Sequence, residues 1–203
     1  MAQNNILTLL KAGQWGEDAP LLQGLAAWPL YPLLLETYET LREDALYDSE
    51  VHGRGHIHRT LLYAALIAWK EGLEEADVKQ LFRAAAYHDV GRSSDGYDLY
   101  HGARSALRIG ELTGVEGEDL IELQAAVTAH ARPDSDMEAI LRSYGPADYP
   151  RTLSLTRLLK DADNLDRVRL GDLKTKFLRH EGAKAVEPFA WRLLEREKEL
   201  EKP

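Results

Sequence analysis

Apolar residues along this chain recur mostly at three- and four-residue spacing, and period-two runs rich in Val, Ile and Thr are almost absent. Spacing of the first kind places apolar side chains on one face of a helix, whereas half-buried strands alternate with a period of two. The pattern therefore predicts an all-α protein. The length of 203 residues is that of one ordinary domain, so we expect a single domain over residues 1–203.

Individual helices are predicted from their apolar stripes and from the glycines that end them. A first amphipathic stretch covers residues 30–46, and a strongly apolar one, TLLYAALIAWKEG, follows His56. The next runs through EEADVKQLFRAAAYHD and stops around Gly91, which puts His88 and Asp89 at its C-terminal end. Three further helical patterns cover residues 103–112, 119–131 and 153–170.

The tail EPFAWRLLEREKELEKP predicts a charged amphipathic helix, most simply a solvated surface element. Its Phe189, Trp191 and Leu194 could instead dock on the core or on a second subunit, which leaves a homo-oligomer open. N-terminal and C-terminal flanking helices thus enclose a central segment, about residues 51–170, that carries the polar motifs.

Composition narrows the classes of function. Hydrophobic residues make up 44% of the chain and charged residues 29%, as in ordinary globular proteins. With no cysteine, any metal must be held by His, Asp or Glu. The net charge of −9 argues against general nucleic-acid binding. The start of the chain lacks signal-peptide features and no stretch reaches the roughly 18 apolar residues of a membrane span, so we expect a cytoplasmic protein without membrane association.

A histidine and an aspartate stand side by side as His88 and Asp89. They offer an imidazole nitrogen and a carboxylate oxygen, both ordinary ligands of divalent transition metals. An isolated His-Asp pair is more often structural, with a core histidine followed by a turn residue. Here the pair has a context, because HGRGHIHRT precedes it and HGARSA, VTAHARP and LLKDADNLDR follow it.

In this order the motifs resemble the HD-domain superfamily of metal-dependent phosphohydrolases, which is named for its His-Asp pair. The resemblance covers well over half of the chain and implies an HD-domain-like helical bundle with ligands in the order His, His-Asp, Asp. The H-x-x-R at His56 and Arg59 looks like the first family motif and implies His56 as the first ligand. His88 and Asp89 follow, and the likeness of ADNLDR to the family's Ala-Asp-x-Leu pattern selects Asp163 as the last.

Spacing alone leaves several of these positions open. His52 and His58 compete for the place of the first ligand. If that ligand faces the site, His58 points well round the helix and should be exposed, while His52 could lie at the rim. Asp161 competes for the place of the last ligand, since helical periodicity does not choose cleanly between the two aspartates. Asp166 would then orient a ligand or an arginine.

Some HD-domain enzymes hold a second metal with extra histidines between the His-Asp pair and the last aspartate. His101 and His130 occupy this interval, and in that arrangement Asp89 would bridge the two ions. The paired histidines of some two-metal relatives are absent, since Ala131 follows His130. One or two ions per chain therefore remain open, and this ligand set suits Mn, Fe, Co, Ni or Zn, or Mg where few histidines bind.

The activity that the resemblance implies is phosphoester hydrolysis. A divalent metal neutralises phosphoryl charge and lowers the pKa of a bound water, so that metal-bound hydroxide attacks phosphorus. Asp89 is a candidate catalytic residue. Three cations near the ligand motifs, Arg59, Arg92 and Lys160, are candidates to bind the phosphate. We expect a small phosphomonoester substrate, first of all a nucleotide. The alternatives are a phosphodiesterase acting on a cyclic or dinucleotide and a regulatory helical module that binds a nucleotide or a protein without turnover.

Overall fold

The computed structural model describes residues 5–13 and 15–200, and over these residues it contains ten α-helices, four short 3₁₀ helices and no strand. The all-α prediction is confirmed. The α-helices are α1 (Asn5–Ala12), α2 (Ala19–Ala26), α3 (Tyr31–Thr40), α4 (Arg54–Glu71), α5 (Glu75–Tyr87), α6 (His101–Thr113), α7 (Gly117–His130), α8 (Asp134–Tyr144), α9 (Tyr149–Leu165) and α10 (Glu181–Leu200). The 3₁₀ helices are η1 (Gly16–Asp18), η2 (Glu43–Ala45), η3 (Asp166–Leu170) and η4 (Thr175–Phe177).

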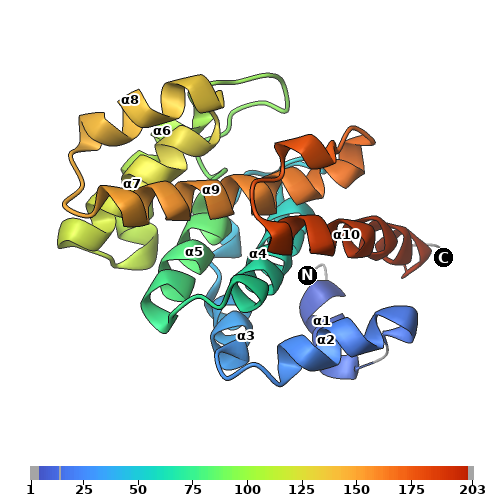
Figure 1. The fold of residues 1–203 in the computed structure, drawn as a ribbon. Helices are drawn as coiled ribbons and strands as arrows, with labels where there is room; N and C mark the ends of the chain where they lie inside the picture. The colour runs from blue at the N-terminus through green and yellow to red at the C-terminus, as the bar shows by residue number, and fades with distance from the viewer. Residues whose placement is uncertain (1–4, 14, 201–203) are drawn as a thin grey trace.

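Helix α9 crosses the middle of the bundle and packs against α4, α5, α7 and α10 (Figure 1). Helices α6, α7 and α8 form one flank, and α10 closes the other beside α4 (Figure 1). The N-terminal helices α1 to α3 cover the remaining side of α4, and α3 also contacts α5. This arrangement brings the C-terminal ends of α5, α7 and α9 towards the first turn of α4.

Helix α4 forms the centre of the hydrophobic core. Every residue from His56 to Ala68 is buried, which is expected of a helix that is covered on all sides. Gly72 ends the helix in the left-handed conformation, with φ of 67°, at the position that the sequence predicts. One continuous cluster of buried side chains extends from Ile6 in α1 to Leu194 in α10.

The C-terminal helix packs on the core instead of standing in solvent. Phe189 and Leu194 are buried and Trp191 is partly exposed. Its apolar face lies against α4 and α9, and the ring of Phe189 meets Tyr63 of α4 edge-on at 6.5 Å. The interpretation of this tail as a solvated surface element is therefore wrong, and docking on the core is what the structure has.

The sequence pattern does not single out α1, α2 and α8, which each bury few side chains; α8 buries only Met137 and Leu141. The predicted stretch 30–46 is α-helical only over Tyr31–Thr40, because Leu41 leaves the helical region with ψ of 123°, and the short 3₁₀ helix η2 follows. In the part of the chain described here, no helix has both the length and the apolar character needed to span a membrane.

Candidate metal centre

All six side chains predicted as metal ligands meet at one place, and each lies at or near the end of a helix. His56 is in the first turn of α4, His88 and Asp89 follow the last residue of α5, and Asp163 is near the end of α9. The remaining two are the first residue of α6, His101, and the last residue of α7, His130. Helix ends let neighbouring side chains turn towards one point, which a continuous helix would prevent.

Four of these side chains form a first group around His56. Its Nε2 lies 3.0 Å from Nε2 of His88, 3.4 Å from Oδ1 of Asp163 and 3.5 Å from Oδ2 of Asp89. Ligand atoms about 2.1 Å from one ion and 90° to 109° apart stand roughly 3.0 to 3.4 Å from each other. The spacing of the first group is therefore that of a metal site.

A second group forms on the other oxygen of Asp89. Nε2 of His101 lies 3.0 Å from Asp89 Oδ1 and 3.0 Å from Nε2 of His130, whose distance to Asp89 Oδ1 is 3.7 Å. Within the described residues Asp89 Oδ1 is buried but accepts no hydrogen bond. A buried carboxylate oxygen without a donor is costly unless a cation binds it. Asp89 thus stands between two histidine pairs, one on each oxygen.

The hydrogen bonds of the four histidines in these two pairs also indicate a metal site. Each Nδ1 faces an oxygen acceptor and donates its proton there: His56 to Asp166 Oδ2 at 2.7 Å, His88 to Ala85 O at 2.9 Å, His101 to Asp98 O at 2.5 Å and His130 to Val127 O at 2.5 Å. In the neutral rings the Nε2 atoms then carry lone pairs, and they face each other in pairs at 3.0 Å. Such pairs repel unless a positive centre lies between them, so the donor set fits divalent metal.

Burial keeps the ligands in the protonation states that metal needs. It lowers the pKa of His56 to about 4, with nearby Arg169 adding to the effect, and it lowers the pKa of His130 to about 4. Burial opposes ionisation of Asp89 and Asp163, but the surrounding imidazoles outweigh it, and both carboxyl pKa values lie below their ordinary range. At neutral pH His56 and His130 are therefore neutral and the two carboxylates are ionised, as metal binding requires.

Two glycines allow the second group to form. A Cβ at Gly91 would lie 2.4 Å from the backbone nitrogen of Ser105 and 2.5 Å from the carbonyl oxygen of His101, so the turn after Asp89 packs directly on α6. A Cβ at Gly102 would lie 2.5 Å from the carbonyl oxygen of Val127, so α6 packs closely on α7. These contacts hold His101 beside Asp89 and beside the end of α7.

The structure brings Asp163 to the cluster and turns Asp161 away from it. Asp161 is fully buried and accepts hydrogen bonds from the backbone nitrogens of Arg179 and His180 at 2.9 to 3.0 Å. It also pairs with the Arg179 guanidinium at 2.9 Å and the His180 ring at 2.8 Å. Its role is to fix the chain where α10 begins.

The other two histidines near the first ligand take different places. His52 lies at the rim, with Nδ1 3.3 Å from Asp89 Oδ2, and this nitrogen accepts a hydrogen bond from Arg169 at 3.1 Å. His58 is buried, which contradicts the expectation of an exposed side chain. Helix α3 covers this face of α4, where Tyr38 donates to the carbonyl of His58 and Glu43 lies 3.1 Å from the His58 ring.

Of the three predicted phosphate-binding cations, the structure brings two to the cluster's cleft. Arg92 lines the cleft and donates to Asp89 Oδ2 at 2.8 Å. Lys160 also lines it, but its Nζ is held by Asp134 at 3.0 Å and by backbone carbonyls. Arg59 is buried behind the cluster and binds Asp166 and the C-terminal helix, so its assignment as a phosphate ligand is wrong.

The cluster opens into a cleft of about 760 Å³ between the 92–101 loop, the start of α8 and the end of α9. Sequence reasoning missed several side chains that line it, among them Arg132, Arg167, Tyr97 and Phe177. Arg132 follows His130 by two positions and Arg167 follows the ADNLD segment, but an arginine near a motif is too common a signal to select either. The cleft walls thus combine cations with exposed aromatic rings.

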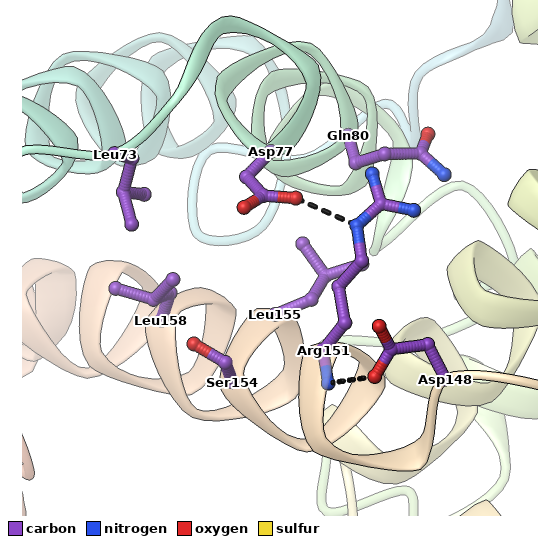
Figure 2. Close-up of a pocket in the computed structure, with 8 residues that line it drawn as sticks. All are labelled: Leu73, Asp77, Gln80, Asp148, Arg151, Ser154, Leu155 and Leu158. Carbon is purple, nitrogen blue, oxygen red and sulfur yellow. Dashed lines mark hydrogen bonds and ion pairs between the residues drawn. The ribbon is translucent and has the colours of Figure 1, made fainter.

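A smaller pocket of about 250 Å³ lies at the opposite ends of α5 and α9 (Figure 2). Leucines 73, 155 and 158 form one wall, and the side chain of Arg151 crosses the other towards Asp77 (Figure 2). None of the candidate metal ligands lines it. It belongs to a separate charged network.

A family model, the HD domain, matches residues 54–168, which is more than half of the chain. The chain therefore belongs to the HD-domain family. No curated protein and no solved structure matches it. The matched segment begins at α4 and ends in η3, so it contains both ligand groups and leaves α1 to α3 and α10 outside.

Proposed function

We propose that this protein is a metal-dependent phosphohydrolase that holds two divalent ions and releases phosphate from a small phosphomonoester, first of all a nucleotide. The observation that carries the proposal is Asp89, whose two oxygens face two pairs of imidazole nitrogens. A carboxylate in that position can bridge two ions. Membership of the HD-domain family, whose members are generally hydrolases, supports the same reading.

Each ligand group would hold one ion. His56, His88, Asp89 and Asp163 would bind the first, and Asp89 with His101 and His130 the second. Divalent ions bound there would supply the charge neutralisation and the activated water that phosphoester hydrolysis requires. The second group has only three protein ligands, which leaves positions for substrate.

The chain's own side chains would position the substrate. Arg92 lines the cleft, donates to the Asp89 carboxylate and so holds its guanidinium beside the cluster. Arg132 and Arg167 also line the cleft and would attract the anionic phosphate towards the cluster. Asp163, partly exposed, lies where the first ligand group meets the cleft.

Exposed aromatic rings support a nucleotide as substrate. Tyr97 is 89% exposed and Phe177 is 54% exposed, and both line the cleft that leads to the cluster. A nucleobase can stack on the face of such a ring. A substrate with its phosphate at the cluster would have its base among these rings.

The test combines metal analysis with a phosphate-release screen. Protein purified without chelators should carry close to two metals per chain and release phosphate from nucleoside monophosphates. Tyr97→Ala should raise KM several-fold for the nucleotide and leave KM unchanged for ribose 5-phosphate, which has no base. Release from cyclic or dinucleotides alone would replace the proposal by a phosphodiesterase. Bound metal without turnover of any ester would favour a regulatory module.

A further inference from the structure

A chain of buried hydrogen bonds connects the candidate metal ligand His56 to the C-terminal helix. His56 Nδ1 donates to Asp166 Oδ2 at 2.7 Å, and Arg59 donates to both oxygens of Asp166, at 2.6 and 3.1 Å. The remaining nitrogen of the Arg59 guanidinium, Nη1, donates to Glu197 Oε2 of α10 at 2.9 Å. All four side chains are at least nine-tenths buried, so water screens these contacts little.

Glu197 completes the charge balance of this network. Two guanidinium groups, those of Arg59 and Arg169, contact Asp166, and its carboxylate alone offsets only one of them. The carboxylate of Glu197 supplies the second negative charge, on the far side of Arg59. Without it, Arg59 would draw more strongly on Asp166 and leave that carboxylate a weaker acceptor for the proton of His56. A histidine whose Nδ1 proton is held less strongly is a poorer metal ligand.

The other end of α10 is fixed to a ligand-bearing helix as well. Asp161 of α9 binds the backbone of Arg179 and His180, just before α10 begins, and it stands two positions before Asp163. The buried Phe189 and Leu193 fasten the middle of α10 to the core. Glu197 is therefore presented to Arg59 by a helix that is anchored along its length.

We propose that Glu197 of α10 is a positioning residue of the metal centre, acting on His56 through Arg59 and Asp166. The inference rests on the proposed metal centre. It extends that centre to a helix outside the segment that matches the HD domain. The C-terminal helix is then part of the working site and not only a cover for the core.

The experiment is a titration of metal-free, full-length protein with Mn²⁺, followed by the paramagnetic resonance signal of the free ion. Glu197→Gln keeps the shape of the side chain and removes its charge. Glu195→Gln, on the exposed side of the same helix, is the matched control. Both variants are repeated in an Asp166→Asn background, or in Arg59→Lys if the first background does not fold. Thermal unfolding of each metal-free protein measures stability separately.

We expect Glu197→Gln to weaken Mn²⁺ binding about three- to tenfold, somewhat less than direct loss of a ligand's hydrogen-bond partner. Glu195→Gln should leave the affinity unchanged, and the effect of Glu197→Gln should vanish in the Asp166→Asn background. An unchanged Mn²⁺ affinity, or an equal loss in both backgrounds, would overturn the role of Glu197. Wild-type protein that binds no Mn²⁺ would instead overturn the metal centre itself.

Discussion

Helices α5 and α9 carry a group of charged side chains at each end, and the two groups differ in how their charges are matched. At the N-terminal ends, Arg151 donates to Asp77 at 2.7 Å, to Glu122 at 2.7 Å and to Asp119 at 3.0 Å (Figure 2 shows the first of these contacts). Its backbone nitrogen donates to Asp148 at 2.9 Å. There each acidic group has a donor.

At the C-terminal ends of α5 and α9, hydrogen-bond acceptors face one another without donors between them. Imidazole nitrogens approach each other at 3.0 Å, and Asp89 Oδ1 is buried without a hydrogen bond among the described residues. The Arg151 network is therefore complete as it stands, whereas the cluster around Asp89 needs a cation. The comparison indicates that changes at one end should alter metal and chemistry, and that changes at the other should alter stability alone.

The largest effect is expected from His88→Ala or Asp89→Ala. Each removes a ligand from the first group, so bound metal and hydrolysis should both be lost, with activity down at least about a hundredfold. The helical circular-dichroism signal should remain largely intact. Full metal content and activity in both variants would show that the cluster around Asp89 does not differ from the Arg151 network in binding metal.

Replacing both His101 and His130 by alanine should reduce the metal content from about two ions per chain towards one. The first group keeps His56, His88 and Asp163 together with Asp89, so it should still bind. Activity should fall as well, because the second ion shares in stabilising phosphoryl charge. A metal count near one in both the wild type and the double variant, with a single anomalous peak in a manganese-soaked crystal, would make the site mononuclear.

Within α9, Asp163→Asn and Asp161→Asn should have different effects, the first on metal binding and the second on stability. Asp163→Asn should weaken metal binding strongly, since its Oδ1 faces the ring of His56. Asp161→Asn should chiefly lower the unfolding temperature, because the start of α10 loses its anchor. Metal titration and thermal unfolding of both variants measure this, and the reverse pattern would show that the helix face is misassigned.

Arg151→Met should leave metal binding unchanged and lower the free energy of unfolding by about 1–3 kcal/mol, between the values for exposed and buried ion pairs. Arg157→Met, exposed on the same helix, is the control.

The same variant should also change how stability depends on pH. Burial raises the pKa of Glu122 and the charge of Arg151 lowers it, so Arg151→Met should raise the pKa of Glu122 further. The folded variant then binds a proton more tightly than the unfolded chain, and its stability should recover as pH falls towards 5. A gap to wild type that widens in acid would contradict this.

Much of the centre could be predicted because its ligands lie in distinctive local segments. AAAYHDVGR places a His-Asp pair at a helix end, and the structure has α5 ending at Tyr87. Periodicity could not choose between Asp161 and Asp163, since that choice depends on where the chain after residue 170 returns. Burial of His58 likewise depends on α3, which lies remote in sequence.

Arg59 shows the limit most clearly. Its motif was recognisable, but its partners, Asp166 and Glu197, lie 107 and 138 positions away along the chain. Local sequence identifies the type of residue at each position, and only the packing of distant helices decides whether an arginine faces a substrate or a buried carboxylate. The docking of α10 was uncertain for the same reason, since an amphipathic stripe does not name the surface that it covers.

The second ligand group depends on Gly91, a residue that binds no metal. One added methyl group there would meet backbone atoms of α6 at 2.4 to 2.5 Å, and these atoms have no rotamer by which to yield. Such a mutation would force apart the helix that carries His101 and the turn that carries Asp89, and so disturb the second ligand group. If two ions bind as proposed, a single substitution at a residue that binds neither of them would thus alter the second ion's site.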